Sequence, residues 1–236
     1  GPGPGLGKSI AVRFAKEGFK VALMSRSVEG CAAAVEGIEK VGGQSLFVAT
    51  DVENTDNIVK SFARVKQEWG SPSVLVYNPT SGPSSFGRGV LELKADDVTS
   101  MWKNQCLGAL TATQQVLPDM IKAKQGTILY SSATSAIRGG KGTCAFSVSK
   151  HGLKALSQSV AKEFASSGIH CAHIRLDCII DGPRAPFYFG DRYEEMKPKL
   201  ANPDDIAETY WSLHMQPKSA WSNEIDVRPY TEGWSC

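Results

Sequence analysis

Short apolar runs recur along the chain at intervals that leave room for a helix between each pair. Each run has the length of a typical strand and consists mainly of aliphatic and aromatic residues. Continuous apolar runs of this kind are typical of strands that are buried on both faces of a parallel sheet. The runs are "FKVALMS" (19–25), "QSLFVAT" (44–50), "PSVLVYN" (72–78), "GTILYSS" (126–132) and "IHCAHIRL" (169–176).

The segments between the runs show helical periodicity, with apolar residues three and four positions apart. The helix that follows the first glycines ends at Gly18, and a later one begins with Asn54 or Thr55 as its capping residue. Two longer helices are predicted over 95–123 and 143–167. The residues expected on buried helical faces are Ile10, Phe14 and Ala15 in the first helix and Ile58, Phe62 and Val65 in the later one.

The strict alternation of strands and helices predicts the fold class. It indicates an α/β protein with a doubly wound parallel sheet, helices on both faces and right-handed crossovers. The chain contains no internal repeat and no linker, so residues 1–236 are interpreted as a single domain.

The chain begins with the glycine loop "GPGPGLGKS", which in such a fold should follow a strand. That first strand would lie in the middle of the sheet, and its removal would leave open hydrogen-bonding edges there. We therefore expect that the chain is truncated at its N-terminus by one short strand. Gly1 and Pro2 are also compatible with a cloning remnant, in which case Gly1 matches the glycine pattern by accident.

Composition excludes several classes of partner. A formal net charge of +2 gives no reason to expect nucleic acid or an acidic membrane surface. No apolar run reaches the ~20 residues of a membrane span. Six cysteines without C-x-x-C spacing predict reduced thiols in a cytoplasmic protein and no metal site. They are Cys31, Cys106, Cys144, Cys171, Cys178 and Cys236.

The N-terminal glycines indicate a nucleotide site. Gly1, Gly5 and Gly7 have the spacing G-x-x-x-G-x-G directly before a helix, where glycine lets the backbone approach a pyrophosphate and the helix N-terminus attracts it. The next strand ends in "MSRS" and carries Arg26 where an acidic residue would bind the ribose hydroxyls of NAD. An arginine there can pair with a 2′-phosphate, so NADP(H) is favoured over NAD(H).

These features, taken in order, resemble the short-chain dehydrogenase/reductase (SDR) family over essentially the whole chain. The landmarks are the glycine loop at 1–7, "TDVEN" at 50–54, "YNPTSG" at 77–82, "WKNQCLG" at 102–108 and "AFSVSK" at 145–150. The resemblance implies a Rossmann-type sheet and NAD(P)-dependent oxidoreductase chemistry. It implies a homo-oligomer, a dimer or tetramer built through the two long helices, and a small-molecule substrate that the sequence does not identify.

The resemblance also implies cofactor contacts. Lys150 is expected to reach the nicotinamide ribose hydroxyls, and Leu6 to offer its backbone N–H to the pyrophosphate. The other implied contacts are Asp51 and Val52 at the adenine end, Asn78 along the cofactor cleft and Ile180 against the nicotinamide carboxamide.

The catalytic pattern implied by the family is only half present. The family uses Asn, Ser, Tyr and Lys to stabilise and protonate a developing alkoxide. Asn104 and Lys150 match, but the tyrosine position is Phe146 and the serine position is Ala133. Phe146 also resembles the pattern of an atypical SDR subgroup that carries phenylalanine at this position.

Three hypotheses follow from the missing hydroxyls. The first is an NADP(H)-dependent oxidoreductase with a substitute acid, for which Tyr188, Tyr193, Asp177 and Thr134 are candidates. The second is a nucleotide-binding pseudoenzyme that acts as a sensor or an inactive subunit. The third is a structural partner that has lost nucleotide binding as well. The first is preferred, while retention of Lys150 and the glycine loop beside the loss of both hydroxyls is what the second predicts.

The remaining conspicuous residues receive structural interpretations. His170 and His173 lie on a predicted core strand and are expected to be hydrogen-bonded core groups, while His214 is expected to be structural or interfacial. The C-terminal tryptophans are expected to cover the substrate cleft or form a subunit contact. They are Trp211, Trp221 and Trp234.

Overall fold

The structure, a computed structural model, describes residues 2–79 and 87–232. Its contacts divide the described chain into two compact units. Unit 1 comprises residues 2–50, 177–216 and 227–232, and unit 2 comprises residues 51–79, 87–176 and 217–226. The prediction of a single domain stays a prediction.

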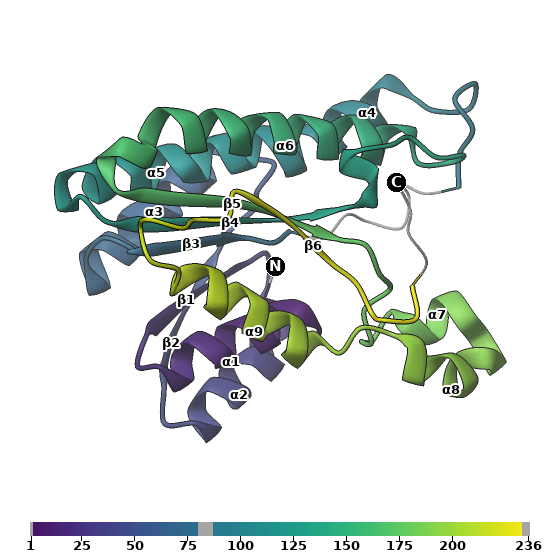
Figure 1. Cartoon of the computed structure of the whole chain (residues 1–236), viewed down its shortest axis with the longest axis horizontal. Helices are drawn as coiled ribbons and strands as arrows, with labels where there is room; N and C mark the ends of the chain where they lie inside the picture. The colour runs from purple at the N-terminus through teal and green to yellow at the C-terminus, as the bar shows by residue number, and fades with distance from the viewer. Residues whose placement is uncertain (1, 80–86, 233–236) are drawn as a thin grey trace. The chain divides into compact units, whose positions relative to one another are not determined.

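Unit 1 contains a two-stranded parallel sheet with helices packed on it (Figure 1). Strand β1 pairs with β2 from Lys20 opposite Gln44 to Ser25 opposite Ala49. The helices and strands are α1 (Leu6–Lys16), β1 (Lys20–Ser25), α2 (Ala32–Lys40), β2 (Gln44–Ala49), α7 (Ala185–Phe189), α8 (Tyr193–Met196) and α9 (Pro203–His214).

Helix α1 is the centre of unit 1, because it packs against both α2 and α9. The rings of Phe14, Phe19 and Trp211 make edge-to-face contacts, with Phe14 and Trp211 centroids 5.3 Å apart. The Arg13 guanidinium lies 4.8 Å from the Trp211 ring centroid and forms a 2.6 Å ion pair with Glu208. Trp211 and His214 of α9 therefore pack against the aromatic residues at the C-terminal end of α1.

Unit 2 contains a four-stranded sheet in the order β3-β4-β5-β6. Strands β3 and β4 are parallel, and their register begins with Val74 opposite Thr127. Strands β4 and β5 are also parallel, and their register begins with Gly126 opposite Ile169. The elements are α3 (Thr55–Trp69), β3 (Val74–Tyr77), α4 (Ala95–Trp102), α5 (Gly108–Ala123), β4 (Gly126–Ala133), α6 (Cys144–Phe164), β5 (Ile169–Leu176) and β6 (Glu224–Val227), whose last residue belongs to unit 1.

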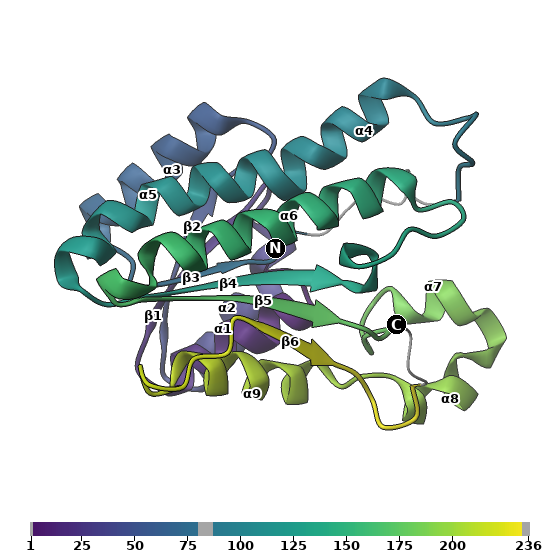
Figure 2. The ribbon, with the colours of Figure 1, turned by 45° about the horizontal axis from the view of Figure 1, so that its top comes forward.

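Helices α5 and α6 lie side by side along the strands of unit 2 (Figure 2). The long helix predicted over 95–123 is interrupted, because Lys103–Leu107 form a π-helical segment between α4 and α5. A Cβ on Gly108 would lie 2.4 Å from both the Tyr77 hydroxyl and the Val52 carbonyl oxygen. Only glycine allows Tyr77 and Val52 to approach the helix this closely. Gly108 is the first residue after the π-helical segment.

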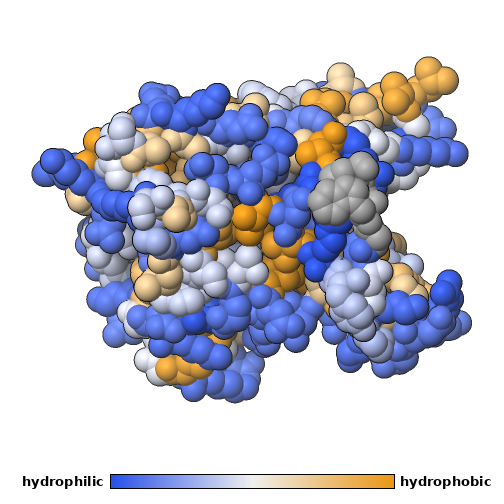
Figure 3. Space-filling model, viewed as in Figure 1, coloured by the Kyte–Doolittle hydropathy of each residue, from blue (hydrophilic) through white to orange (hydrophobic). Residues whose placement is uncertain are grey.

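The predicted parallel α/β fold is confirmed, and the predicted faces of α1 and α3 are buried. Asn54 is the capping residue of α3, and its side chain accepts a hydrogen bond from the Asn57 amide at 3.0 Å. Hydrophilic residues predominate on the face drawn in Figure 3. No helix among the described residues is long and apolar enough to span a membrane.

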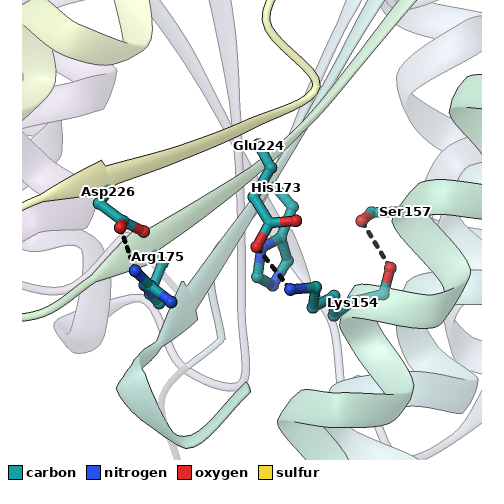
Figure 4. A network of polar contacts seen from close by, with 6 residues as sticks. All are labelled: Lys154, Ser157, His173, Arg175, Glu224 and Asp226. Atoms are coloured by element: carbon teal, nitrogen blue, oxygen red, sulfur yellow. Dashed lines mark hydrogen bonds and ion pairs between the residues drawn. The ribbon is translucent and has the colours of Figure 1, made fainter. Parts of the chain in front are cut away.

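One expectation about the core strand is wrong. His170 Nε2 donates a hydrogen bond to the Ser222 carbonyl at 3.0 Å, and the His170 ring stacks on Trp221. His173 is 1% exposed, yet in the described structure neither ring nitrogen has a hydrogen-bond partner. Its Nδ1 lies 4.0 Å from Glu224, whose carboxylate is already paired with Lys154 at 2.7 Å (Figure 4). Burial lowers the pKa of His173 to about 4.

Candidate active site

The glycine turn before α1 is the predicted phosphate site. The Lys8 amide is bonded to the carbonyls of Gly3 and Gly5, both at 3.0 Å, while the amides of a helix's first turn have no intrahelical acceptor. A Cβ on Gly5 would meet no atom within 4 Å, so the backbone is open there. Leu6 and Gly7 begin the helix, with the Leu6 side chain buried. Gly1 lies outside the described residues.

The loop after β1 presents Arg26 to solvent. Its neighbours hold the loop, because the Gly30 amide donates to Ser27 Oγ at 3.3 Å and a Cβ on Gly30 would lie 3.1 Å from Ser25 Oγ. An exposed guanidinium on a braced loop is able to form bidentate bonds with a phosphate. The residues of unit 1 therefore fit a phosphorylated nucleotide.

The adenine-end residues predicted in unit 2 lie before α3. Asp51 is exposed, and its Oδ1 accepts a hydrogen bond from the Glu53 amide at 3.0 Å. The Val52 carbonyl faces Gly108, as described above. Asn78 is half-buried directly after β3. The cofactor contacts expected of these three residues stay predictions.

Lys150 lies in the interior of unit 2, where it is 5% exposed. Its Nζ donates to Gln105 Oε1 at 2.7 Å and to the Ser131 carbonyl at 2.9 Å. Burial lowers the pKa of Lys150 to about 7, because removal from water disfavours the charged ammonium. Both the amine and the ammonium are therefore populated near neutral pH.

The two substituted catalytic positions belong to elements that pack together. Phe146 stands one turn before Lys150 on α6, with its ring centroid 5.5 Å from Nζ, within the range of a cation–π contact. Ala133 ends β4, and the turn Thr134–Ala136 that follows it packs against α6. Ser132 Oγ, next to Ala133, is buried without a partner among the described residues. Neither substituted side chain has a proton to donate.

Asn104, the predicted catalytic amide, has both oxygens engaged. Its backbone carbonyl accepts a hydrogen bond from the Tyr77 hydroxyl at 2.5 Å, and its Oδ1 accepts one from Gln105 Nε2 at 2.7 Å. Burial raises the pKa of Tyr77, so this hydroxyl remains a donor. Asn104 is thus joined to Lys150 through Gln105.

Gln105 joins the site although none of the sequence motifs assigns it a role. It is fully buried at 0% exposure and contacts both predicted catalytic residues. A signal was available, because Gln105 interrupts a stripe of apolar residues with helical spacing. A buried polar residue in such a stripe calls for a partner. The stripe comprises Met101, Ala109, Ala112, Val116 and Met120.

The candidate substitute acids of unit 1 are engaged or exposed. The Tyr193 hydroxyl donates to Asp181 Oδ1 at 2.7 Å, and this bond raises the pKa of Tyr193. Asp177 is buried with the Arg228 guanidinium 3.7 Å from its carboxylate, while Tyr188 on α7 is 58% exposed. Ile180 forms an isolated bridge with Ala201.

An open cavity of about 650 Å³ lies beside the Tyr193–Asp181 hydrogen bond in unit 1. Lys197 contributes a positive charge to the cavity lining, and its Nζ lies 5.6 Å from the Tyr193 ring centroid. The cavity has the size of a small-molecule site. Its lining residues are Asp181, Gly182, Pro183, Pro186, Tyr193, Lys197, Leu200, Asn202 and Pro203.

Comparison with known proteins decides the family. The family profile described as short chain dehydrogenase matches residues 1–180, well over half of the chain. The chain belongs to the short-chain dehydrogenase family. A 3beta-hydroxysteroid dehydrogenase of Mediterraneibacter gnavus is 32% identical over 170 residues, which is 71% of this chain and 59% of that enzyme. The match thus spans about three fifths of that relative's length.

Solved structures of other short-chain dehydrogenases are similar along nearly the whole chain. One from Rhodopseudomonas palustris is 30% identical, with a TM-score of 0.79, and the match covers 95% of this chain and 93% of that one. A metagenomic short-chain oxidoreductase in complex with NADP is 25% identical, with a TM-score of 0.82 and coverage of 97% and 93%. The glycine turn and Lys150 therefore belong to a fold that this chain shares with other short-chain dehydrogenases.

Proposed function

We propose that this short-chain dehydrogenase is an NADP(H)-dependent oxidoreductase that acts on a carbonyl or alcohol substrate with an incomplete catalytic set. The observation that carries the proposal is the interior position of Lys150. A lysine is costly to bury, and a structural core position is better filled by an apolar side chain. A buried amine whose pKa is brought to about 7 is typical of a functional site.

The proposed cofactor contacts combine the described geometry with the family's pattern. Gly5, Leu6 and Gly7 offer backbone N–H groups to the pyrophosphate, and Arg26 pairs with the 2′-phosphate. When bound, the reduced nicotinamide supplies a hydride to the substrate carbon. The 3beta-hydroxysteroid dehydrogenase and the NADP complex among the relatives support this class of reaction and cofactor. The remaining proposed contacts are Asp51, Val52, Asn78 and Ile180.

The cofactor proposal is tested by titrating NADPH and NADH into the protein and following melting temperature and fluorescence. A ligand of the native state must raise the melting temperature. Arg26→Asp is expected to weaken NADPH binding by about 10- to 100-fold, because a charge-assisted bond to the 2′-phosphate is lost, and to spare NADH. Arg64→Asp, on the exposed face of α3, is the control of equal charge change. Equal loss of both cofactors in Arg26→Asp would contradict the preference for NADP(H).

A second candidate function is a nucleotide-binding pseudoenzyme, and Phe146 is the observation that favours it. A positioned general acid typically contributes ~10²–10⁴ in rate. Phe146 also resembles the pattern of an atypical subgroup that carries phenylalanine at the tyrosine position. That resemblance is compatible with an oxidoreductase and with a pseudoenzyme. A panel of carbonyls and alcohols distinguishes them, because cofactor binding without turnover supports the pseudoenzyme. Absence of binding of either cofactor would reject both functions and leave a structural role.

A further inference from the structure

The incomplete catalytic set raises the question of which group supplies a proton. The Tyr193 hydroxyl is directed at Asp181, which raises its pKa and makes it a weaker acid. Asp177 is buried, and its carboxylate is already engaged in an ion pair with the Arg228 guanidinium at 3.7 Å. These two groups are therefore poor replacements for a tyrosine hydroxyl.

Lys150 has the geometry that these groups lack. A protonated amine has three N–H bonds, and Gln105 Oε1 and the Ser131 carbonyl take two of them. The phenyl ring of Phe146 lies over the same nitrogen without a hydroxyl to bind it. Within residues 2–79 and 87–232, one N–H bond of Lys150 is thus left for a further oxygen acceptor.

We propose that Lys150 is the proton donor to the substrate oxygen and that Gln105 positions its Nζ for this role. The proposal rests on the proposed oxidoreductase function and assigns the proton donor of that same site. Gln105 acts through Lys150: its Oε1 accepts from Nζ at 2.7 Å, and its Nε2 is held by Asn104 Oδ1 at 2.7 Å. The side-chain amide of Gln105 is therefore held by hydrogen bonds at both its oxygen and its nitrogen in a buried position.

The proton and electron balance of the step is complete with a reduced nicotinamide dinucleotide as the reductant. Its hydride bonds to the carbonyl carbon, so the substrate is reduced by two electrons and the dinucleotide is oxidised. The electron pair of the C=O π bond moves to oxygen, and that oxygen takes the proton from Lys150 Nζ. Lys150 is left as a neutral amine and regains a proton from solvent. Alcohol oxidation uses the same groups in reverse, with the neutral amine as base.

The protonation behaviour of Lys150 agrees with this role. Its pKa of about 7 allows it to lose and regain a proton near neutral pH, where a general acid is most efficient. The titratable groups that interact with Lys150 from neighbouring elements are Cys106 in the π-helical segment and His173 on β5. Burial raises the pKa of Cys106 to about 11 and lowers that of His173 to about 4, so both are neutral at pH 7. Further along α6, Lys154 is paired with Glu224.

The first measurement needs no turnover. Protein with ¹³C-labelled lysine is titrated by NMR, and Lys150→Met identifies the Lys150 signal. Wild type is expected to titrate near pH 7. Gln105→Glu places a carboxylate beside Nζ and should raise the Lys150 pKa by about one unit or more. Gln105→Met removes the acceptor and should lower it, while Gln114→Glu, on the exposed face of α5, should leave it unchanged.

The second measurement connects this pKa to the reaction. For carbonyl reduction, kcat/KM should fall about tenfold per pH unit above the Lys150 pKa, and in Gln105→Glu the falling limb should move up by the same amount as the NMR pKa. If Gln105→Glu does not fold, Gln105→Asn replaces it, since its shorter amide should lower the Lys150 pKa and move the limb down.

The outcomes separate the two proposals. Turnover whose pH profile stays in place while the Lys150 pKa moves would overturn Lys150 as the donor and leave the oxidoreductase function standing. A Lys150 pKa that is unchanged in the Gln105 variants would overturn the positioning role of Gln105. Absence of turnover by wild type with NADPH bound would overturn the proposed function and the proton donor with it.

Discussion

Three buried polar side chains define the character of unit 2 at the scale of single residues. Gln105, Lys150 and His173 are each no more than 5% exposed. Gln105 and Lys150 satisfy each other, so most of the cost of burying them is recovered. Among the residues that the structure describes, His173 has no hydrogen-bond partner, and its burial favours the neutral form.

His173 should make the stability of the protein fall as the pH is lowered. Its folded pKa of about 4 lies below the unfolded value of about 6.5, so the unfolded state binds more protons between these values. The free energy of unfolding should therefore drop by up to about 3 kcal/mol as the pH falls from about 6.5 to about 4.

Urea unfolding at several pH values checks this prediction, with His173→Leu as the variant that cannot titrate. The variant should lose the part of the pH dependence that lies in this window. An identical slope of stability against pH in both proteins would show that His173 is not responsible.

At the scale of elements, the π-helical segment decides which residues meet at the site. A π turn adds one residue to the helix and changes the direction of the side chains in it. Here it directs Gln105 to Lys150 and the Asn104 carbonyl to the Tyr77 hydroxyl. The helix predicted over 95–123 exists in three consecutive parts, and the middle part was not predictable from periodicity, because the Tyr77 contact is made by a residue on a distant strand.

Gly108 should be required for this arrangement. In Gly108→Ala the new Cβ would lie 2.4 Å from the Tyr77 hydroxyl and from the Val52 carbonyl, and the second is backbone that cannot rotate away. The expected loss of stability is about 1–3 kcal/mol, although alanine is the better helix former. Chemical denaturation measures it, with Gly139→Ala as the control, since a Cβ there meets no atom within 4 Å. Equal stabilities of the two variants would contradict the close approach.

At the scale of the whole molecule, we propose that the chain forms a homo-oligomer through helices α4, α5 and α6. These helices pack against one another and expose large apolar side chains. Trp102 is 44%, Leu110 38% and Val148 50% exposed. Exposed apolar residues that gather on one group of helices are typical of an interface.

Trp102→Glu should lower the molar mass measured by light scattering from that of a dimer or tetramer toward that of the monomer. A charge placed in an apolar interface loses its hydration without gaining a partner. Phe187→Glu, on α7, is the control at an exposed aromatic residue and should leave the mass unchanged. A wild-type protein that is monomeric at all concentrations would overturn the proposal.

The strands β1 to β5 and the helices α1 to α3 were determined by the sequence itself, because their signals are local. The runs predicted at 19–25, 44–50, 72–78, 126–132 and 169–176 each coincide with a strand, and the face formed by Ile58, Phe62 and Val65 is buried as its spacing predicts. Burial of apolar side chains at a fixed period needs no knowledge of the partner element. The position of Lys150, one turn after Phe146 on a helix, follows from spacing for the same reason.

Tertiary structure alone decided how the polar residues are paired. The pairs Gln105–Lys150 and Arg175–Asp226 join residues 45 and 51 positions apart in the sequence. His173 has no hydrogen-bond partner among the described residues, and this too could not be seen from its neighbours in the sequence. The same amino acids in other surroundings would be solvated surface groups. Short local motifs are thus enough to predict the family and its cofactor chemistry. The proposed proton chemistry instead depends on which side chains the fold buries and which hydrogen-bond partners it gives them.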